Sequence, residues 1–344
     1  MEACDEEVFQ DLTMALQRHV NLLKDPSKVK RRRAIQHISR KIEELCDEAE
    51  EKKGPALVVQ KLFLESLAPN VTACLKDESE KPREISVGLC RMVLPFLDLE
   101  KSKNGGLVFK SFIKPIHHQI GTHPTLEPSE EVRLAMLELT IDMLEYAPRY
   151  AVDNLDDLMA ISTNSCKDAF PKVKVKVGVL IERIASLVLL RLTDLPASSI
   201  TQLAGQLAKA LASNLKHQRF RVRAAALRGI SAVVEARGCV EQWFREAFNV
   251  LATMTMDRTP SVRVLLAQRV ARWLVCLKLE RSDRSKLLLV LISLVGDDDP
   301  SCREAAIQGL TEIGNSKEIM EAMRAERKLD SGSDEGGGGG SINK

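Results

Sequence analysis

Paired aspartate and arginine residues recur along the chain and are the first candidates for chemistry. Asp257 precedes Arg263, and Asp299 precedes Arg303, each at the start of a segment striped with apolar residues. Such pairs can resemble catalytic groups. In a repeated helical turn, however, the aspartate can accept the exposed N–H groups at a helix start, and the arginine can pair with the acid of the next turn. We therefore expect a structural role. The turn residues predicted in this way are Asp168, Pro171, Arg223, Asp257, Pro260, Arg263, Pro300 and Arg303.

Three histidines near one loop, His117, His118 and His123, are candidates for metal binding. No cysteine lies near them, and the carboxylates are not at ligand spacing, so we expect no metal site. Asn104-Gly-Gly is not followed by Lys-Ser or Lys-Thr and lacks the residues of a phosphate loop. No segment has the surroundings of a nucleophile elbow. We predict a non-enzymatic protein without a cofactor.

The eight cysteines are spread along the chain, and none has the Cys-x-x-Cys spacing of a redox or zinc motif. We expect them to be reduced and mostly buried, as is typical of a cytoplasmic protein. The acidic start, MEACDEEVFQ, differs from a signal or transit peptide. No apolar run reaches the roughly 18 residues of a membrane span. These features favour a cytoplasmic location and no membrane association.

Two basic clusters are candidates for partner binding. The run KVKRRR at 28–33 has the composition of a nuclear localisation signal, although its position at a helix start favours a solvated helix face. A second cluster lies at the starts of two neighbouring helices, which stacking would align into one basic ridge. The residues predicted to bind a partner there are Lys172, Lys174, Lys176, Lys216, Arg219 and Arg221. We expect an acidic protein surface rather than nucleic acid, because no aromatic residues interleave to stack bases and the whole chain carries a net charge of only +2.

The elements that position these residues are helices arranged in a repeat. The apolar residue of the turn falls at positions 29, 85, 132, 173, 222, 262 and 302. The later intervals, of about 40 to 50 residues, are typical of HEAT or armadillo repeats. Each interval holds two striped helical segments. Pro260 suits the first position of a helix, and Thr259 before it is a candidate cap.

Apolar stripes at helical spacing identify the faces that should be buried. The predicted stripe of the helix after Pro260 is Val262, Leu266, Val270, Trp273 and Leu277, and that of the helix over 28–51 is Val29, Ile35, Ile38, Ile42 and Leu45. One such helix cannot bury its stripe alone, so neighbouring repeats must stack. We predict an all-α, HEAT/armadillo-type α-solenoid of about seven helix pairs over residues 1–329. Residues 330–344, DSGSDEGGGGGSINK, are predicted to be a disordered glycine-rich tail.

The amino-acid sequences of the turns in the second half of the chain resemble those of a known family. The segments are HQRFRVRAAAL at 217–227, DRTPSVR at 257–263 and WLVCL at 273–277, with DAFPKVK at 168–174 and EVRLA at 131–135 in the same register. At these separations the chain resembles the dynein axonemal assembly factor 5 family, well over 125–315 and in outline before that. Members of that family are longer than this chain.

The resemblance implies a cytoplasmic scaffold that helps to preassemble the dynein arms of cilia. Its expected partners are dynein chains, chaperones or other assembly factors. A rival from another class is a HEAT-repeat adaptor in nuclear transport or in a chromosome-associated complex, which the KVKRRR run favours. Nuclear residence would support the rival.

Overall fold

The computed structural model describes residues 3–51, 55–102, 104–191, 196–237, 241–317, 319–321 and 323–324. Within these ranges the regular structure is helical and contains no strand. The predicted tail at 330–344 lies outside the described residues. The chain divides into two compact units, Met1–Ala236 and Arg237–Lys344, and each is described by itself.

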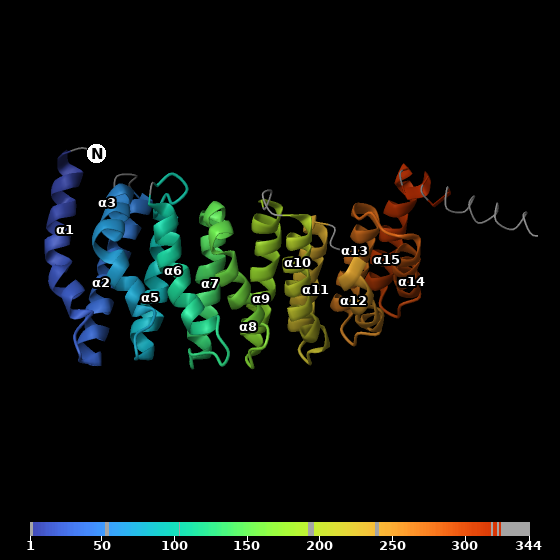
Figure 1. Ribbon diagram of the computed structural model, residues 1–344, viewed down its shortest axis with the longest axis horizontal. Coiled ribbons are helices and arrows are strands. Elements are labelled where there is room, and N and C mark those ends of the chain that lie inside the picture. The colour runs from blue at the N-terminus through green and yellow to red at the C-terminus, as the bar shows by residue number, and fades with distance from the viewer. Residues whose placement is uncertain are drawn as a thin grey trace, which may run out of the picture. The chain divides into compact units, whose positions relative to one another are not determined.

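The first unit consists of five helix pairs. Figure 1 shows them side by side in chain order, and each pair contains a first helix and an antiparallel second helix. The pairs are α1 (Ala3–Leu22) with α2 (Lys28–Glu51), α3 (Pro55–Leu62) and α4 (Ala68–Cys74) with α5 (Glu80–Val93), α6 (Gly105–Ile120) with α7 (Glu130–Tyr146), α8 (Leu155–Ser165) with α9 (Pro171–Arg183), and α10 (Ala197–Ala212) with α11 (Phe220–Arg237).

Two layers result from this stacking. The first helices contact each other along α4, α6, α8 and α10, and the second helices contact each other along α2, α5, α7 and α9. Between α9 and α11 the approach is very close. A Cβ atom added to Gly178 would lie 2.8 Å from the carbonyl oxygen of Ala225, and one added to Gly229 would lie 3.0 Å from the carbonyl oxygen of Gly178. Glycine is therefore required where these helices cross.

The second unit contains two further pairs, α12 (Glu241–Met254) with α13 (Pro260–Cys276) and α14 (Arg281–Val295) with α15 (Pro300–Asn315). Helix α13 packs along α15, and Gly309 allows close contact with Ala271. The described residues therefore form seven helix pairs, and the predicted all-α solenoid fold is confirmed.

The predicted stripes form the core, with two exceptions. Val262, Leu266, Val270 and Trp273 are completely buried. Leu277 follows α13 as its C-cap residue and is only half-buried. Val29 is 47% exposed, so its assignment to the stripe of α2 was wrong. Val29 precedes Ile35 by six residues, which at about 100° per residue places it on a different face of α2 from the stripe; Arg31 of the same turn faces the next pair through Asp77, and the buried stripe starts with Ala34 and Ile35.

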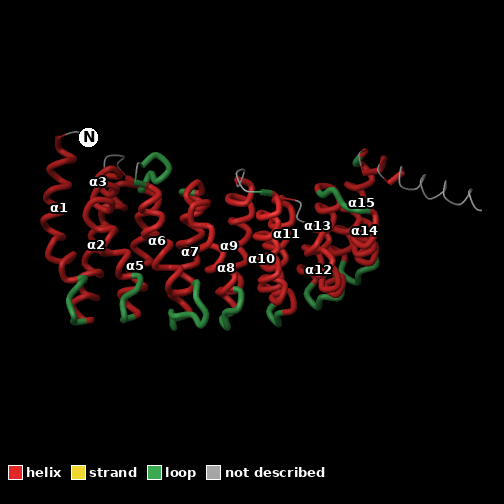
Figure 2. The backbone as a smooth tube through the Cα atoms, in the orientation of Figure 1, coloured by secondary structure: helices red, strands yellow, loops and turns green. Residues whose placement is uncertain are grey.

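The turns that join the first helix of each pair to the second are the part of the fold that positions the candidate site. In the first unit these loops lie along one edge, the lower edge in Figure 2. Because the helix pairs repeat, equivalent turn residues lie in a row along that edge.

Candidate functional site

Arginine and acidic residues link successive turns of the first unit. In each link, the arginine near the start of a second helix donates two hydrogen bonds to the acid in the next turn. These pairs are Arg31 with Asp77, Arg83 with Glu127, and Arg133 with Asp168. We call this series of arginine–acid pairs the ladder. In it, each arginine lies against the acid of the following repeat.

The pair of Arg83 and Glu127 illustrates the geometry. Arg83 donates from Nε to Oε2 at 2.5 Å and from Nη2 to Oε1 at 2.8 Å, and its Nη1 donates to the carbonyl oxygen of Asp77 at 2.7 Å. Glu127 also accepts the backbone N–H of Ser129 at 2.9 Å. The acid therefore closes its own turn and holds the arginine of the preceding pair. Bidentate contacts of this kind fix register as well as contributing energy.

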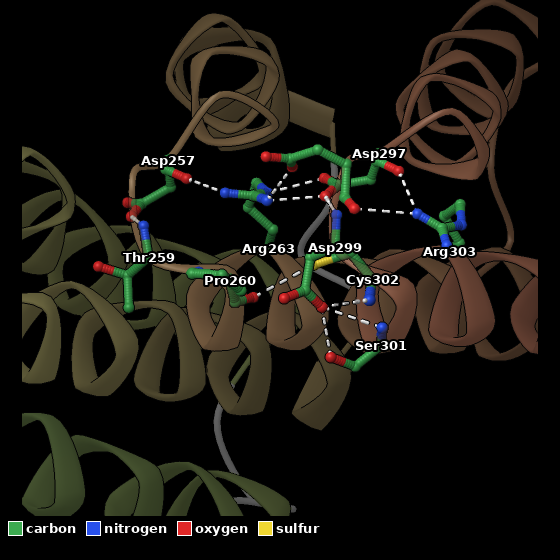
Figure 3. Close-up of polar contacts among 10 residues, drawn as sticks. Asp257, Thr259, Pro260, Arg263, Asp297, Asp299, Ser301, Cys302 and Arg303 are labelled. Carbon is green, nitrogen blue, oxygen red and sulfur yellow. Dashed lines mark hydrogen bonds and ion pairs between the residues drawn. The ribbon is translucent and has the colours of Figure 1, made fainter.

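The second unit repeats the arrangement, as Figure 3 shows. Arg263 donates to Asp297 from Nε and Nη2, both at 2.7 Å, and its Nη1 donates to the carbonyl oxygen of Asp257 at 2.6 Å. The guanidinium of Arg263 holds the pKa of Asp297 well below its usual range. The acid in the ladder is thus Asp297, two residues before the Asp299 that the sequence pattern had singled out.

Asp299 has a different role, because it caps α15. Its Oδ1 accepts the backbone N–H groups of Ser301 at 2.9 Å and Cys302 at 3.4 Å. A hydrogen bond from the Ser301 hydroxyl lowers the pKa of Asp299. At the equivalent turn the side chain of Thr259 does not cap α13, contrary to expectation. Instead, its backbone N–H donates to Asp257 at 2.9 Å.

The first-unit ladder lacks an acid at the turn before α11. His217 stands there, and its Nδ1 accepts the backbone N–H of Arg219 at 3.0 Å. In the preceding turn Lys174 replaces the arginine, and its Nζ donates to the carbonyl oxygen of Cys166 at 2.8 Å and to Oδ1 of Asn214 at 2.9 Å. Neutral acceptors therefore replace the carboxylate. Burial lowers the pKa of Lys174, and burial followed by the charge of Lys174 lowers the pKa of His217.

The structure separates the predicted binding residues into three groups. Lys176 pairs with Glu138 at 2.8 Å and is therefore neutralised. Lys174 is half-buried and occupied by the neutral contacts just described. Lys172, Lys216, Arg219 and Arg221 are exposed on two turns that hydrogen-bond to each other.

Two aromatic residues accompany these cations, although the sequence analysis expected none to interleave. Phe220 lies between Arg219 and Arg221 and is 42% exposed, and the guanidinium of Arg221 lies 5.9 Å from its ring centre. Lys172 lies at the same distance from the ring of Phe170. The expectation that no aromatic residue interleaves with these cations was therefore wrong, because each of the two turns carries one phenylalanine beside its basic residues.

Further basic residues, which the sequence analysis missed, line a groove between α8 and α10. It has a volume of about 380 Å³ and is lined by Thr163, Lys167, Gln206, Lys209, Ala210 and Ser213. A signal for this region was present in the sequence, because residues 195–234 include no Asp or Glu at all.

His117, one of the three histidines considered for metal binding, takes part in an ion-pair cluster. It lies 2.9 Å from Asp157, which also pairs with Lys114 at 2.8 Å. Among the described residues, no group of three or more His, Cys, Asp or Glu side chains is arranged to hold a metal ion. In the same ranges, no helix combines the length and apolar character needed to cross a membrane.

Six cysteines fall within the described side chains, and all six are free. Five are buried, and burial raises the pKa of Cys74 and Cys166 to about 12. Cys276 is exposed at the end of α13.

Comparison with known proteins places this solenoid in a family. The family model described as dynein axonemal assembly factor 5-like, TPR repeats, matches residues 22–321. The chain belongs to this family. It is 28% identical over 331 residues to dynein axonemal assembly factor 5 of Xenopus laevis, covering 95% of this chain and 36% of that protein. It is 25% identical over 312 residues to the Homo sapiens protein of the same name, covering 88% and 34%. The chain thus spans about a third of the length of these relatives.

Solved structures give the same fold. A designed armadillo repeat protein aligns with a TM-score of 0.51 at 12% identity, covering 71% of this chain and 98% of that chain. A computationally designed armadillo repeat protein for modular peptide recognition aligns with a TM-score of 0.50 at 14% identity, covering 80% and 99%. At this identity the likeness concerns the fold alone, which is the armadillo-type solenoid predicted from the sequence.

Proposed function

We propose that this chain is a non-enzymatic scaffold in the cytoplasmic preassembly of axonemal dynein arms. It acts by binding dynein subunits, chaperones or other assembly factors. One observation carries the proposal: the assembly-factor family model matches 22–321, which is most of the solenoid.

The architecture supports a binding role. In a solenoid each helix pair contacts only its neighbours, so both layers and both edges stay accessible along the stack. The most conspicuous ionisable groups of the turns, the ladder arginines and their acids, hold the repeats together. A scaffold needs no reactive group, because many weak contacts spread over an extended surface suffice to hold a client protein.

Removal of the protein from ciliated cells tests the proposal. We expect the outer and inner dynein arms to be lost in cross-sections viewed by electron microscopy, and the cilia to be immotile. Re-expression of the chain in its complete natural form should restore both. A tagged protein should be found in the cytoplasm while cilia are being built. Normal arms and normal beating after complete removal would contradict the scaffold role.

The rival role as a nuclear adaptor rests on the first basic run. Lys28, Lys30, Arg32 and Arg33 are exposed at the start of α2, whereas Arg31 is engaged by Asp77. Cell fractionation separates the two roles. A mainly nuclear protein that becomes cytoplasmic when Lys28, Arg32 and Arg33 are replaced by alanine would favour the rival.

A further inference from the structure

The fifth helix pair concentrates positive charge in a chain that is nearly neutral. The whole chain carries a net charge of +2. In contrast, residues 195–234 contain six Lys and Arg residues and no Asp or Glu. Charge of one sign gathered on one part of a protein raises the local concentration of oppositely charged partners and steers their approach.

The ladder explains why this charge stays uncompensated. At four other turns a carboxylate neutralises the arginine of the preceding repeat, through Asp77, Glu127, Asp168 and Asp297. At the turn before α11 that carboxylate is replaced by His217. Asn214 and the carbonyl oxygen of Cys166 each accept a hydrogen bond from Lys174, but neither brings a negative charge. Neutral hydrogen-bond acceptors therefore stand at this turn where the other turns have a carboxylate.

The exposed cations around this turn belong to one continuous region. The turn after α8 and the turn after α10 are joined by hydrogen bonds from Lys174 to Asn214 and from Asn214 to the carbonyl oxygen of Cys166. Lys167 and Lys209 line the groove between the ends of the same two helices. We name these residues the basic turn surface: Lys167, Lys172, Lys209, Lys216, Arg219 and Arg221. In the described ranges, none of the six forms an ion pair with a carboxylate.

We propose that the basic turn surface is a docking site for an acidic segment of a partner protein, a stretch rich in Asp and Glu. The groove between α8 and α10 accommodates part of the segment, and its carboxylates pair with the exposed lysines and arginines. The proposed function supplies the reason for expecting a protein partner. The chemistry of the site follows from the charges and contacts alone.

A protein segment suits this surface better than nucleic acid. Continuous binding of a nucleic acid strand requires a track of cations with several aromatic platforms. This surface offers one substantially exposed ring, Phe220, and the guanidinium of Arg221 already lies beside it. The carboxylates of an acidic segment need only the cations.

Fluorescence anisotropy with a labelled peptide tests the site. The probe is a fluorescein-labelled 16-residue peptide in which glutamate alternates with serine, titrated with the complete purified chain at low and at high salt. We expect binding that weakens as salt rises, because the contacts are between exposed charges. The triple variant Lys216→Glu, Arg219→Glu, Arg221→Glu should bind at least tenfold more weakly. A matching peptide with lysine in place of glutamate should not bind.

A matched control separates the site from net charge. The triple variant Lys28→Glu, Arg32→Glu, Arg33→Glu makes the same change in net charge on exposed residues of α2, and we expect its affinity to stay within twofold of the unaltered chain. Circular dichroism checks that each variant folds. If charge reversal unfolds the fifth pair, replacement of the same three residues by glutamine should still weaken binding about threefold.

Several results would overturn the proposal. Equal losses of peptide affinity in both triple variants would mean that binding depends only on the net charge of the chain. An unchanged affinity in the variant of Lys216, Arg219 and Arg221 would mean that the peptide binds elsewhere. Single-stranded RNA of equal charge that binds more tightly through the same three residues would identify a nucleic-acid surface. Self-association that the same variant abolishes would make a second copy the occupant. These measurements use purified components, so a failure to bind the peptide would not contradict the proposed role in dynein-arm assembly. Conversely, normal dynein arms after removal of the protein would contradict that role but not a measured peptide-binding site.

Discussion

Removing the negative charge of Glu127 should destabilise the first unit more than any exposed ion-pair substitution. The substitution Glu127→Gln keeps the size of the side chain and an oxygen that can accept the Ser129 N–H. It takes away the partner of Arg83, whose side chain is only 6% exposed, while that of Glu127 is fully buried. The guanidinium would then remain buried without a counter-charge.

The burial of this ion pair determines how much stability the substitution should cost. Removing one member of a buried ion pair costs about 3–5 kcal/mol, because the other charge is left uncompensated. For a unit of this length that corresponds to a fall of roughly 6–20 °C in melting temperature. The pair of Arg183 and Glu145, 3.0 Å apart with both side chains 45% exposed, provides the control. Glu145→Gln should cost less than about 1 kcal/mol, since water already screens that pair.

Urea unfolding at pH 7 followed by circular dichroism measures both variants. The two tryptophans, at positions 243 and 273, lie in the second unit, so their fluorescence reports on that unit separately. A double-mutant cycle with Arg83→Met isolates the pair. The double variant should be more stable than the sum of the single losses predicts, by about 1–3 kcal/mol, because it leaves no unpaired buried charge.

Two results would refute this reasoning. If Glu127→Gln and Glu145→Gln cost the same, burial does not determine the strength of the ladder. If the losses of the two single variants simply add, Arg83 and Glu127 do not act as a pair.

Three further predictions concern packing, thiol reactivity and pH. Gly178→Ala should lower the melting temperature although alanine has the higher helix propensity, because the new Cβ would meet a backbone carbonyl at 2.8 Å. Gly88→Ala, with open space around it, should instead raise stability by up to about 1 kcal/mol. Equal effects of the two substitutions would contradict the close helix contact at Gly178. A thiol reagent followed by peptide mapping should modify exposed Cys276 rapidly and spare Cys166, whose pKa burial raises to about 12; the reverse order would refute the burial assigned to them. Asp297→Asn should lower the urea midpoint of unfolding, followed by tryptophan fluorescence, at pH 7. The difference in midpoint between the variant and the unaltered chain should shrink as pH falls from about 4 towards 2, because the paired arginine lowers the pKa of this carboxyl in the folded state and its contribution to stability is lost on protonation. A difference that is constant over this range would contradict the ion pair.

Much of the fold could be predicted because each helix pair carries its own local signals. The proline at the start of α13 and the apolar spacing of Val262, Leu266 and Val270 are properties of a single segment, and these side chains are buried as expected. The misassignment of Val29 arose from the spacing itself. Val29 precedes Ile35 by six residues, which at about 100° per residue places the two side chains on different faces of α2, whereas Arg31 in the same turn faces the next pair through Asp77.

The candidate site was only partly predictable, because charge pairing depends on neighbours that are distant in the chain. The sequence pattern grouped Lys176 with the other lysines of α9, but Glu138 on α7 neutralises it. It did not connect Lys167 with Lys209, which lie in different helices and line the same groove.

By itself, the sequence determined that the chain is a stack of paired helices, since repeat length, turn chemistry and apolar spacing are all written in consecutive residues. Only the tertiary structure decided which charges meet. Arg263 could have met Asp297 or Asp299 from spacing alone, and the register between stacked helices pairs it with Asp297, and also with the exposed Asp298, and leaves Asp299 as the cap. The same register places Lys174 against the amide of Asn214 rather than against a carboxylate, so this contact adds no negative charge beside the exposed lysines and arginines of the two turns.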